Sequence, residues 1–215
     1  MKIINESEIF KVNPNYTAEL VKLGGTGNVT DTGSVSVLVV DDFYQNPESI
    51  RDLVLSIPCT KFSPDRVNHV NKNSNINITY DLRSLVATYQ NLIENYFPKK
   101  GFERFADHRV LNTIFSKHPF AVNVMQSKDR NIIPLSHPST GFFSEIFLNI
   151  EGECAWGSSF YSDTSNCIGV IPMEFNRMLL FDNRVFHNPY MEKDSFVDDI
   201  FRISQLLYIN DTMIQ

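Results

Sequence analysis

The sequence has little charge, few cysteines and no long apolar run. Asp, Glu, Lys and Arg make up 20% of its 215 residues, and 25 acidic against 19 basic residues give a net charge of −6. This balance argues against a nucleic-acid binder, because such binding is driven by neutralisation of phosphates. No apolar stretch approaches the roughly 18 residues of a membrane span, and the apolar core of a secretory signal is missing behind Met1. We therefore expect a cytoplasmic protein that binds neither nucleic acid nor a membrane.

Cysteines and the common catalytic motifs are also scarce. The three cysteines, Cys59, Cys154 and Cys167, have no C-x-x-C spacing, so we expect no disulfide framework. Apolar or small residues surround each of them, which predicts thiols that fill the core. The motifs G-x-x-x-x-G-K-[ST], G-x-G-x-x-G and G-x-S-x-G are absent, which argues against a phosphate-binding loop and a hydrolase nucleophile elbow.

What is abundant indicates a β-rich fold. The 17 phenylalanines supply bulky core side chains, and the many asparagines are typical of loops and turns. We predict one α+β domain over residues 1–215. It is expected to comprise an N-terminal arm with weak strands (1–34), a strand with supporting helices (35–108) and a β core (109–210).

Local patterns predict the individual elements. The β-branched run at 35–43 predicts a buried strand, and Asn46-Pro47 predicts a helix start with Asn46 as the N-cap. Apolar residues at helical spacing predict a second helix over 81–97, after an Asn-rich loop. Further strands are predicted at 109–115, 119–126, 142–150, 156–162, 167–171, 177–181 and 201–209. Together these elements predict a sandwich or barrel with the helices packed on one outer face.

Three residues in the second half stand out by their sequence context and spacing. His187 follows His137 by 50 residues, and Arg202 follows His187 by 15. The alternative for Arg202 is a structural pair with Asp198 or Asp199.

Other polar and aromatic residues nearby have simpler interpretations. Asp182, Asn183 and Arg184 are predicted to form a turn. Trp156 is predicted to be a core residue, with a pocket-lining role as the alternative.

Residues 35–210 resemble the double-stranded β-helix, or jelly-roll, proteins of the Fe(II)/2-oxoglutarate-dependent dioxygenase family, especially small prolyl-hydroxylase-like proteins of bacteria and phages. The resemblance rests on the spacing above and on the segments Val39-Val40-Asp41-Asp42-Phe43, Ile146-Phe147-Leu148-Asn149 and Gly157-Ser158-Ser159-Phe160-Tyr161. It implies iron bound by His137 and His187, and 2-oxoglutarate bound by Arg202 with Ser204. It further implies hydroxylation of a substrate, small molecule or protein, whose identity the sequence does not give.

The sequence departs from the family at one ligand. Non-haem Fe(II) in these enzymes is held by two imidazoles and one carboxylate, and the carboxylate position, two residues after His137, is Ser139. A serine hydroxyl supplies no negative charge. Glu145 or Asp163 is an alternative carboxylate, and a halide in the vacated position or iron held by the two histidines and cosubstrate alone are others.

Two further interpretations assign the protein no oxygenase activity. In one, the site has decayed and the jelly roll serves binding or assembly, as a homo-oligomer or as a component of a phage particle, which would place it in the virion. In the other, the protein is a cupin-like binder of a different metal or a small molecule. Ser139 favours the first of these.

Overall fold

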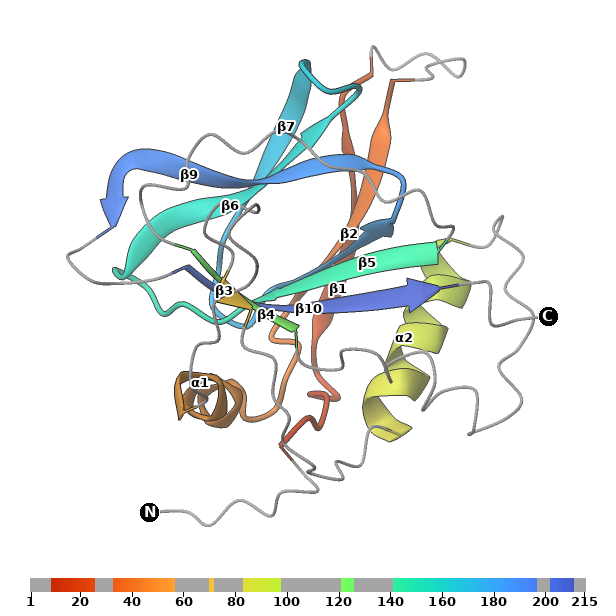
Figure 1. The fold of residues 1–215 in the computed structure, drawn as a ribbon. Coiled ribbons are helices and arrows are strands. Elements are labelled where there is room, and N and C mark those ends of the chain that lie inside the picture. Colours follow the sequence, from red (N-terminus) through yellow and green to blue (C-terminus); the bar gives the residue numbers. More distant parts are fainter. Residues whose placement is uncertain are drawn as a thin grey trace.

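The computed structural model describes residues 9–25, 33–56, 70–71, 83–97, 121–125, 141–196 and 202–210. They form two antiparallel sheets and two helices (Figure 1). The strands are β1 (Thr17–Leu23), β2 (Val35–Asp41), β3 (Val70–Asn71), β4 (Ala121–Met125), β5 (Gly141–Phe147), β6 (Cys154–Tyr161), β7 (Cys167–Pro172), β8 (Met178–Asp182), β9 (Phe186–Phe196) and β10 (Arg202–Asn210). The helices are α1 (Pro47–Ser56) and α2 (Arg83–Tyr96).

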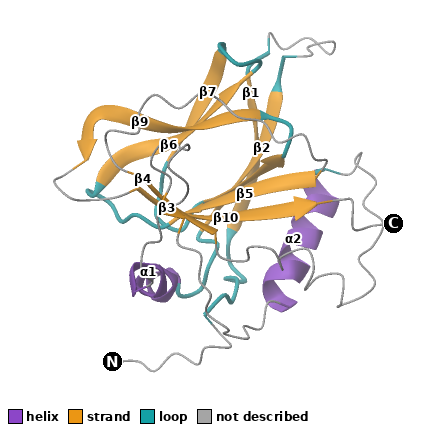
Figure 2. Ribbon diagram, viewed as in Figure 1, coloured by secondary structure: helices purple, strands orange, loops and turns teal. Residues whose placement is uncertain are grey.

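The two sheets stack face to face as a sandwich. The larger sheet has the strand order β1-β2-β8-β5-β10-β4-β3, and the smaller has the order β7-β6-β9. Both helices lie on the outer face of the larger sheet, on the side away from β6 and β9 (Figure 2). The predicted α+β class, with helices on one outer face of a β sandwich, is confirmed at this level.

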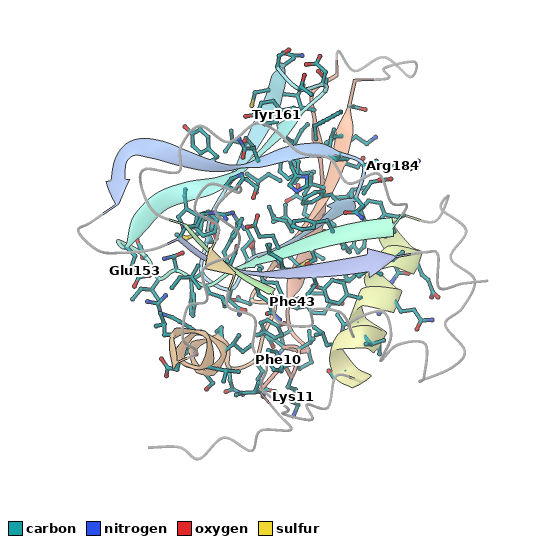
Figure 3. All side chains as sticks on the ribbon, viewed as in Figure 1. Phe10, Lys11, Phe43, Glu153, Tyr161 and Arg184 are labelled. Carbon is teal, nitrogen blue, oxygen red and sulfur yellow. The ribbon has the colours of Figure 1, made fainter. Side chains whose placement is uncertain are left out.

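Alternation along the strands of the larger sheet separates two cores. On β5, Phe142 and Ile146 pack in the core that includes both helices, whereas Phe143 and Phe147 pack against the smaller sheet. The side chains of a strand point alternately to its two faces, so one strand serves both cores. Phe10 and Phe43 lie in the helix-side core (Figure 3).

Both helices form where the sequence predicts them. Pro47 occupies the first turn of α1 and Ser49 N donates to Asn46 O, consistent with a helix start at Asn46-Pro47. On α2, one stripe of apolar side chains is buried against the sheet, namely Leu85, Val86, Tyr89, Leu92 and Ile93. Within the described ranges, neither helix has the length and apolar character needed to cross a membrane.

Strand β9 corrects the sequence prediction, which had no strand between 181 and 201. Its sequence contains Pro189 and a charged stretch and shows no regular alternation. The proline is tolerated because, among the described strands, β9 is an edge of the smaller sheet. Pairing with β6, from Cys154↔Phe196 to Tyr161↔Phe186, therefore outweighs the local signal.

Other expectations have mixed outcomes. In the arm, β1 is a complete strand paired along its length with β2. Cys167 is exposed, so its predicted role as a core-filling thiol is wrong, because it begins the edge strand β7. The strand predicted at 109–115 lies outside the described residues, as does most of the Asn-rich loop at 63–79, of which Val70–Asn71 forms β3.

Candidate functional site

Arg202 is the largest fully buried side chain among the described residues, and it lies between the two sheets. Its guanidinium pairs with the carboxylate of Glu145 on β5. The guanidinium carbon also lies 3.9 Å from the ring centroid of Trp156 on β6, a cation–π contact with the opposite sheet. A cation of zero exposure is thus held by one strand of each sheet.

The position of Arg202 follows from the alternation of β10. Ile203, Leu207 and Ile209 belong to the helix-side core, so Arg202, Ser204 and Leu206 face the other sheet. Because β10 lies between β5 and β4, this inner face has a paired strand on each side.

Glu145 bridges the two sheets. It lies opposite Leu206 in the β5–β10 register, so the Arg202 side chain extends along the inner face to reach it. Its second carboxylate oxygen accepts a hydrogen bond from Ser158 Oγ on β6. Glu145 is only 4% exposed, so this carboxylate is also a buried charge.

Two buried polar atoms of the same interior have no hydrogen-bond partner among the described residues. They are Ser204 Oγ, on the inner face of β10, and Trp156 Nε1, on the ring that stacks on the Arg202 guanidinium. Buried polar groups are nearly always satisfied, so such atoms call for an explanation such as a bound ligand. Both can donate a hydrogen bond to an anion.

His187 lies on β9 and faces the same interior. Its ring packs 4.8 Å from the ring of Phe143 and 4.9 Å from that of Phe181. Its Nδ1 lies 2.9 Å from Val185 O. A carbonyl oxygen only accepts, so in the neutral ring Nδ1 carries the proton and Nε2 the lone pair, which is the form that binds a metal or accepts a proton.

Strand β6 orders these groups along the interior. The Arg202 guanidinium lies over Trp156, Glu145 bonds to Ser158, and His187 pairs with Phe160. Trp156 and Phe160 are four residues apart, roughly 13 Å at about 3.3 Å per residue. Glu145 therefore occupies the stretch between the buried cation and the imidazole.

The start of β10 is fixed from outside the interior. Leu148 N donates to Ile203 O, and the buried Asn149 accepts from Ile203 N at 2.7 Å through Oδ1. Asn149 Nδ2 in turn donates to Glu153, which forms an ion pair with Arg51 of α1. The backbone next to Arg202 is thus tied to the β5–β6 turn and through it to α1.

Two buried tyrosines brace the same strands from the helix side. Tyr44 donates to Gln205 of β10 at 3.0 Å, and the Tyr89 hydroxyl lies 2.7 Å from Ser144 Oγ of β5. Burial raises the pKa of both phenols well above the usual 10. They therefore remain neutral hydrogen-bonding groups behind the candidate site.

A separate cleft of about 490 Å³ lies between β1, β2 and β7. Its lining includes Arg177, which is bound by Asp41 at 2.6 Å and Glu174 at 2.9 Å. None of the Arg202, Glu145 and His187 side chains lines it. We take the interior as the candidate site, because the unsatisfied Ser204 Oγ and Trp156 Nε1 are there.

The sequence-predicted site is only partly visible. Arg202, Ser204 and His187 face one interior, whereas His137 and Ser139 lie outside the described residues. Arg202 pairs with Glu145; the alternative partners, Asp198 and Asp199, also lie outside the described residues.

The alternative carboxylates have different fates. Asp163 lies in an exposed turn, where hydrogen bonds from Ser165 lower the pKa of its carboxyl, so it is not part of the interior. Glu145 is in the interior but is engaged with Arg202 and Ser158.

The other predictions near the site are resolved by geometry. Trp156 is a core residue, as predicted, and its ring also lies against the Arg202 guanidinium; its alternative role as a pocket-lining residue stays a prediction. The turn at 182–184 is confirmed, with Arg184 bound to Asp182 at 2.8 Å, and Figure 3 shows Arg184 at the other end of the sandwich from Glu153. Ser158 was not predicted as a site residue, although it lies in the segment 157–161 on which the family resemblance partly rests.

The described residues fit the two implied groups unequally. A buried arginine with two nearby donors suits the carboxylate of 2-oxoglutarate. For iron, the described residues supply one imidazole, and within the part of the chain that the structure describes no three His, Cys, Asp or Glu side chains are grouped to hold a metal ion. An iron site is therefore not formed by these residues alone.

Sequence comparisons add no relative to this picture. No protein-family model matches the chain, and no curated protein matches it. The family resemblance rests on the residues and spacings of the chain itself.

Proposed function

We propose that the protein is a double-stranded β-helix protein of the 2-oxoglutarate-dependent oxygenase type, which binds the distal carboxylate of 2-oxoglutarate with Arg202 and Ser204. This proposal rests on the fully buried Arg202 between two sheets and on the hydroxyl of Ser204, two residues further on the same face, which has no hydrogen-bond partner within the described residues. A buried ion pair is seldom kept for stability, because desolvation of the two charges offsets most of their attraction. A role in binding is the better explanation for this cation.

The strand connections support the proposed fold. The chain changes sheet between β5 and β6, between β7 and β8, between β8 and β9, and between β9 and β10. Such alternation between two sheets is what a jelly roll requires.

In this family, the substrate, 2-oxoglutarate and O₂ are converted to the hydroxylated substrate, succinate and CO₂, and a bound Fe(II) would supply the oxidation chemistry. The residues of this chain would orient the cosubstrate by the charge of Arg202 and exclude water with the aromatic side chains of the interior core, among them Phe143, Phe160 and Phe181. His187 and His137 are the proposed metal ligands. Ser139 at the carboxylate position implies weaker iron binding than in a complete site.

The single tryptophan of the chain makes the carboxylate part of this proposal testable without metal. Trp156 stacks on Arg202, so 2-oxoglutarate arriving at the guanidinium is expected to change its fluorescence. The change should saturate in the wild type and in Arg184→Met, a control that removes an exposed arginine. It should vanish in the double variant Arg202→Met/Glu145→Gln, which removes both charges of the buried ion pair.

The oxygenase part needs iron. Anaerobic addition of Fe(II) and 2-oxoglutarate is expected to give the charge-transfer absorption of the chelate, and air should then release succinate. Absence of both the absorption band and succinate release would refute the oxygenase activity. Absence of any fluorescence change with 2-oxoglutarate would refute the proposed cosubstrate site.

A second function is favoured by one pair of observations. Ser139 removes the usual carboxylate, and Glu145 already neutralises Arg202. A non-catalytic jelly roll used for interaction or assembly would need neither ligand. In that case, 2-oxoglutarate leaves the fluorescence unchanged, and sedimentation equilibrium should show an oligomer.

A further inference from the structure

We infer that Glu145 is an internal competitor for Arg202: its carboxylate occupies the place of the ligand carboxylate, and a dicarboxylate binds by displacing it. The inference rests on the proposed function and names how that same site is regulated. Glu145 lies between the Arg202 guanidinium and the His187 ring along β6.

Chemically, Glu145 presents to Arg202 what a dicarboxylate would present. Its carboxylate accepts a charge-assisted hydrogen bond from Arg202 Nη2. The two carboxylates cannot share the same guanidinium N–H groups in an interior of low dielectric without like-charge repulsion. A ligand anchored on Arg202 and extending toward His187 therefore requires Glu145 to move.

The surroundings give each state its own hydrogen bonds. With Glu145 on Arg202, Ser158 Oγ donates to Glu145, whereas Ser204 Oγ and Trp156 Nε1 have no partner among the described residues. A ligand carboxylate on Arg202 would provide an acceptor for those two donors. The unsatisfied pair thus belongs to the closed state and is expected to be satisfied in the bound state.

Competition of this kind lowers the apparent affinity. Only the fraction of molecules in which Glu145 has left Arg202 can bind, so the dissociation constant rises by the inverse of that fraction. Weakening the Glu145–Arg202 pair should therefore tighten ligand binding. If the ion pair were purely structural, weakening it would instead loosen ligand binding, because the residues around Arg202 would lose their order.

The test is titration of metal-free protein with 2-oxoglutarate, followed by Trp156 fluorescence and by calorimetry. Glu145→Gln keeps the shape and removes the charge, and it is expected to bind at least about tenfold more tightly than the wild type, the change that follows if the competent fraction is a tenth or less. Ser158→Ala removes only the hydrogen bond that holds Glu145, so a smaller gain is expected. Asp41→Asn, which alters a carboxylate–arginine pair outside the interior, should leave the affinity unchanged.

The outcomes separate the inference from the proposed function. If the wild type binds 2-oxoglutarate and the Glu145 and Ser158 variants bind it equally or less tightly, the competitor role is wrong while the proposed site stands. If none of the proteins binds, both are wrong. Should Glu145→Gln fail to fold, as judged by circular dichroism, Ser158→Ala decides the question alone, because it keeps both charges.

Discussion

Replacement of Asn149 by alanine is expected to lower the free energy of unfolding by about 2–4 kcal/mol. Asn149 is fully buried and is the acceptor for Ile203 N at 2.7 Å. Without it, that N–H is left buried without an acceptor, which costs about 1–3 kcal/mol. The bond to the Glu153 carboxylate, at 3.0 Å, contributes about 1 kcal/mol more, because Glu153 is partly accessible to water.

Urea unfolding followed by Trp156 fluorescence measures this loss, with the wild type in parallel. Glu153→Gln is the comparison, since it keeps an acceptor for Asn149 and removes only the charge; it should lose about 1 kcal/mol. Because Ile203 adjoins Arg202, Asn149→Ala is also expected to weaken 2-oxoglutarate binding. A stability of Asn149→Ala within about 0.5 kcal/mol of the wild type, the range usual for surface substitutions, would refute the reasoning.

Two further predictions concern packing and pH. A Cβ at Gly157 would lie 2.2 Å from Ile171 O, so Gly157→Ala is expected to lower the free energy of unfolding in urea by about 3 kcal/mol or more. Gly152→Ala is the control: Gly152 has φ +84°, and a Cβ there would have no atom within 4 Å, so a loss of about 1 kcal/mol is expected. Equal losses in the two variants would contradict the clash at Gly157. Burial raises the pKa of Tyr44 and Tyr89 above the usual 10. The unfolded chain then loses these protons first, so the free energy of unfolding should hold below pH 10 and fall above it. Ultraviolet absorbance of tyrosinate during alkaline titration checks this: at least two phenols, those of Tyr44 and Tyr89, are expected to ionise only with unfolding. Ionisation of these phenols in the folded protein would contradict the prediction.

Sequence patterns predicted those elements whose own residues favour the observed secondary structure. The β-branched run before Asp41 and the helix start at Asn46-Pro47 are examples, because backbone preference and burial act there in the same direction. Strand β9 was missed because its pairing with β6 and not its own composition makes it a strand.

The site divides in the same way. Spacing and sequence context singled out His187, Arg202 and Ser204, which do face one interior. The Arg202–Glu145 pair was not predicted, since its two residues are 57 positions apart and come together only through the register of β5 with β10. Sequence spacing alone contains no information on that register.

The place of β10 has a consequence for how the protein is made. This strand, the last described one in chain order, inserts between β5 and β4. Strand β2 likewise pairs with the distant strand β8, with Val37 opposite Phe181. Such distant pairings make folding slow, and they leave partly formed sheets with open edges while the chain emerges from the ribosome. Arg202 enters the interior only when β10 inserts, so completion of the sheet and formation of the buried Arg202–Glu145 ion pair are a single event during synthesis.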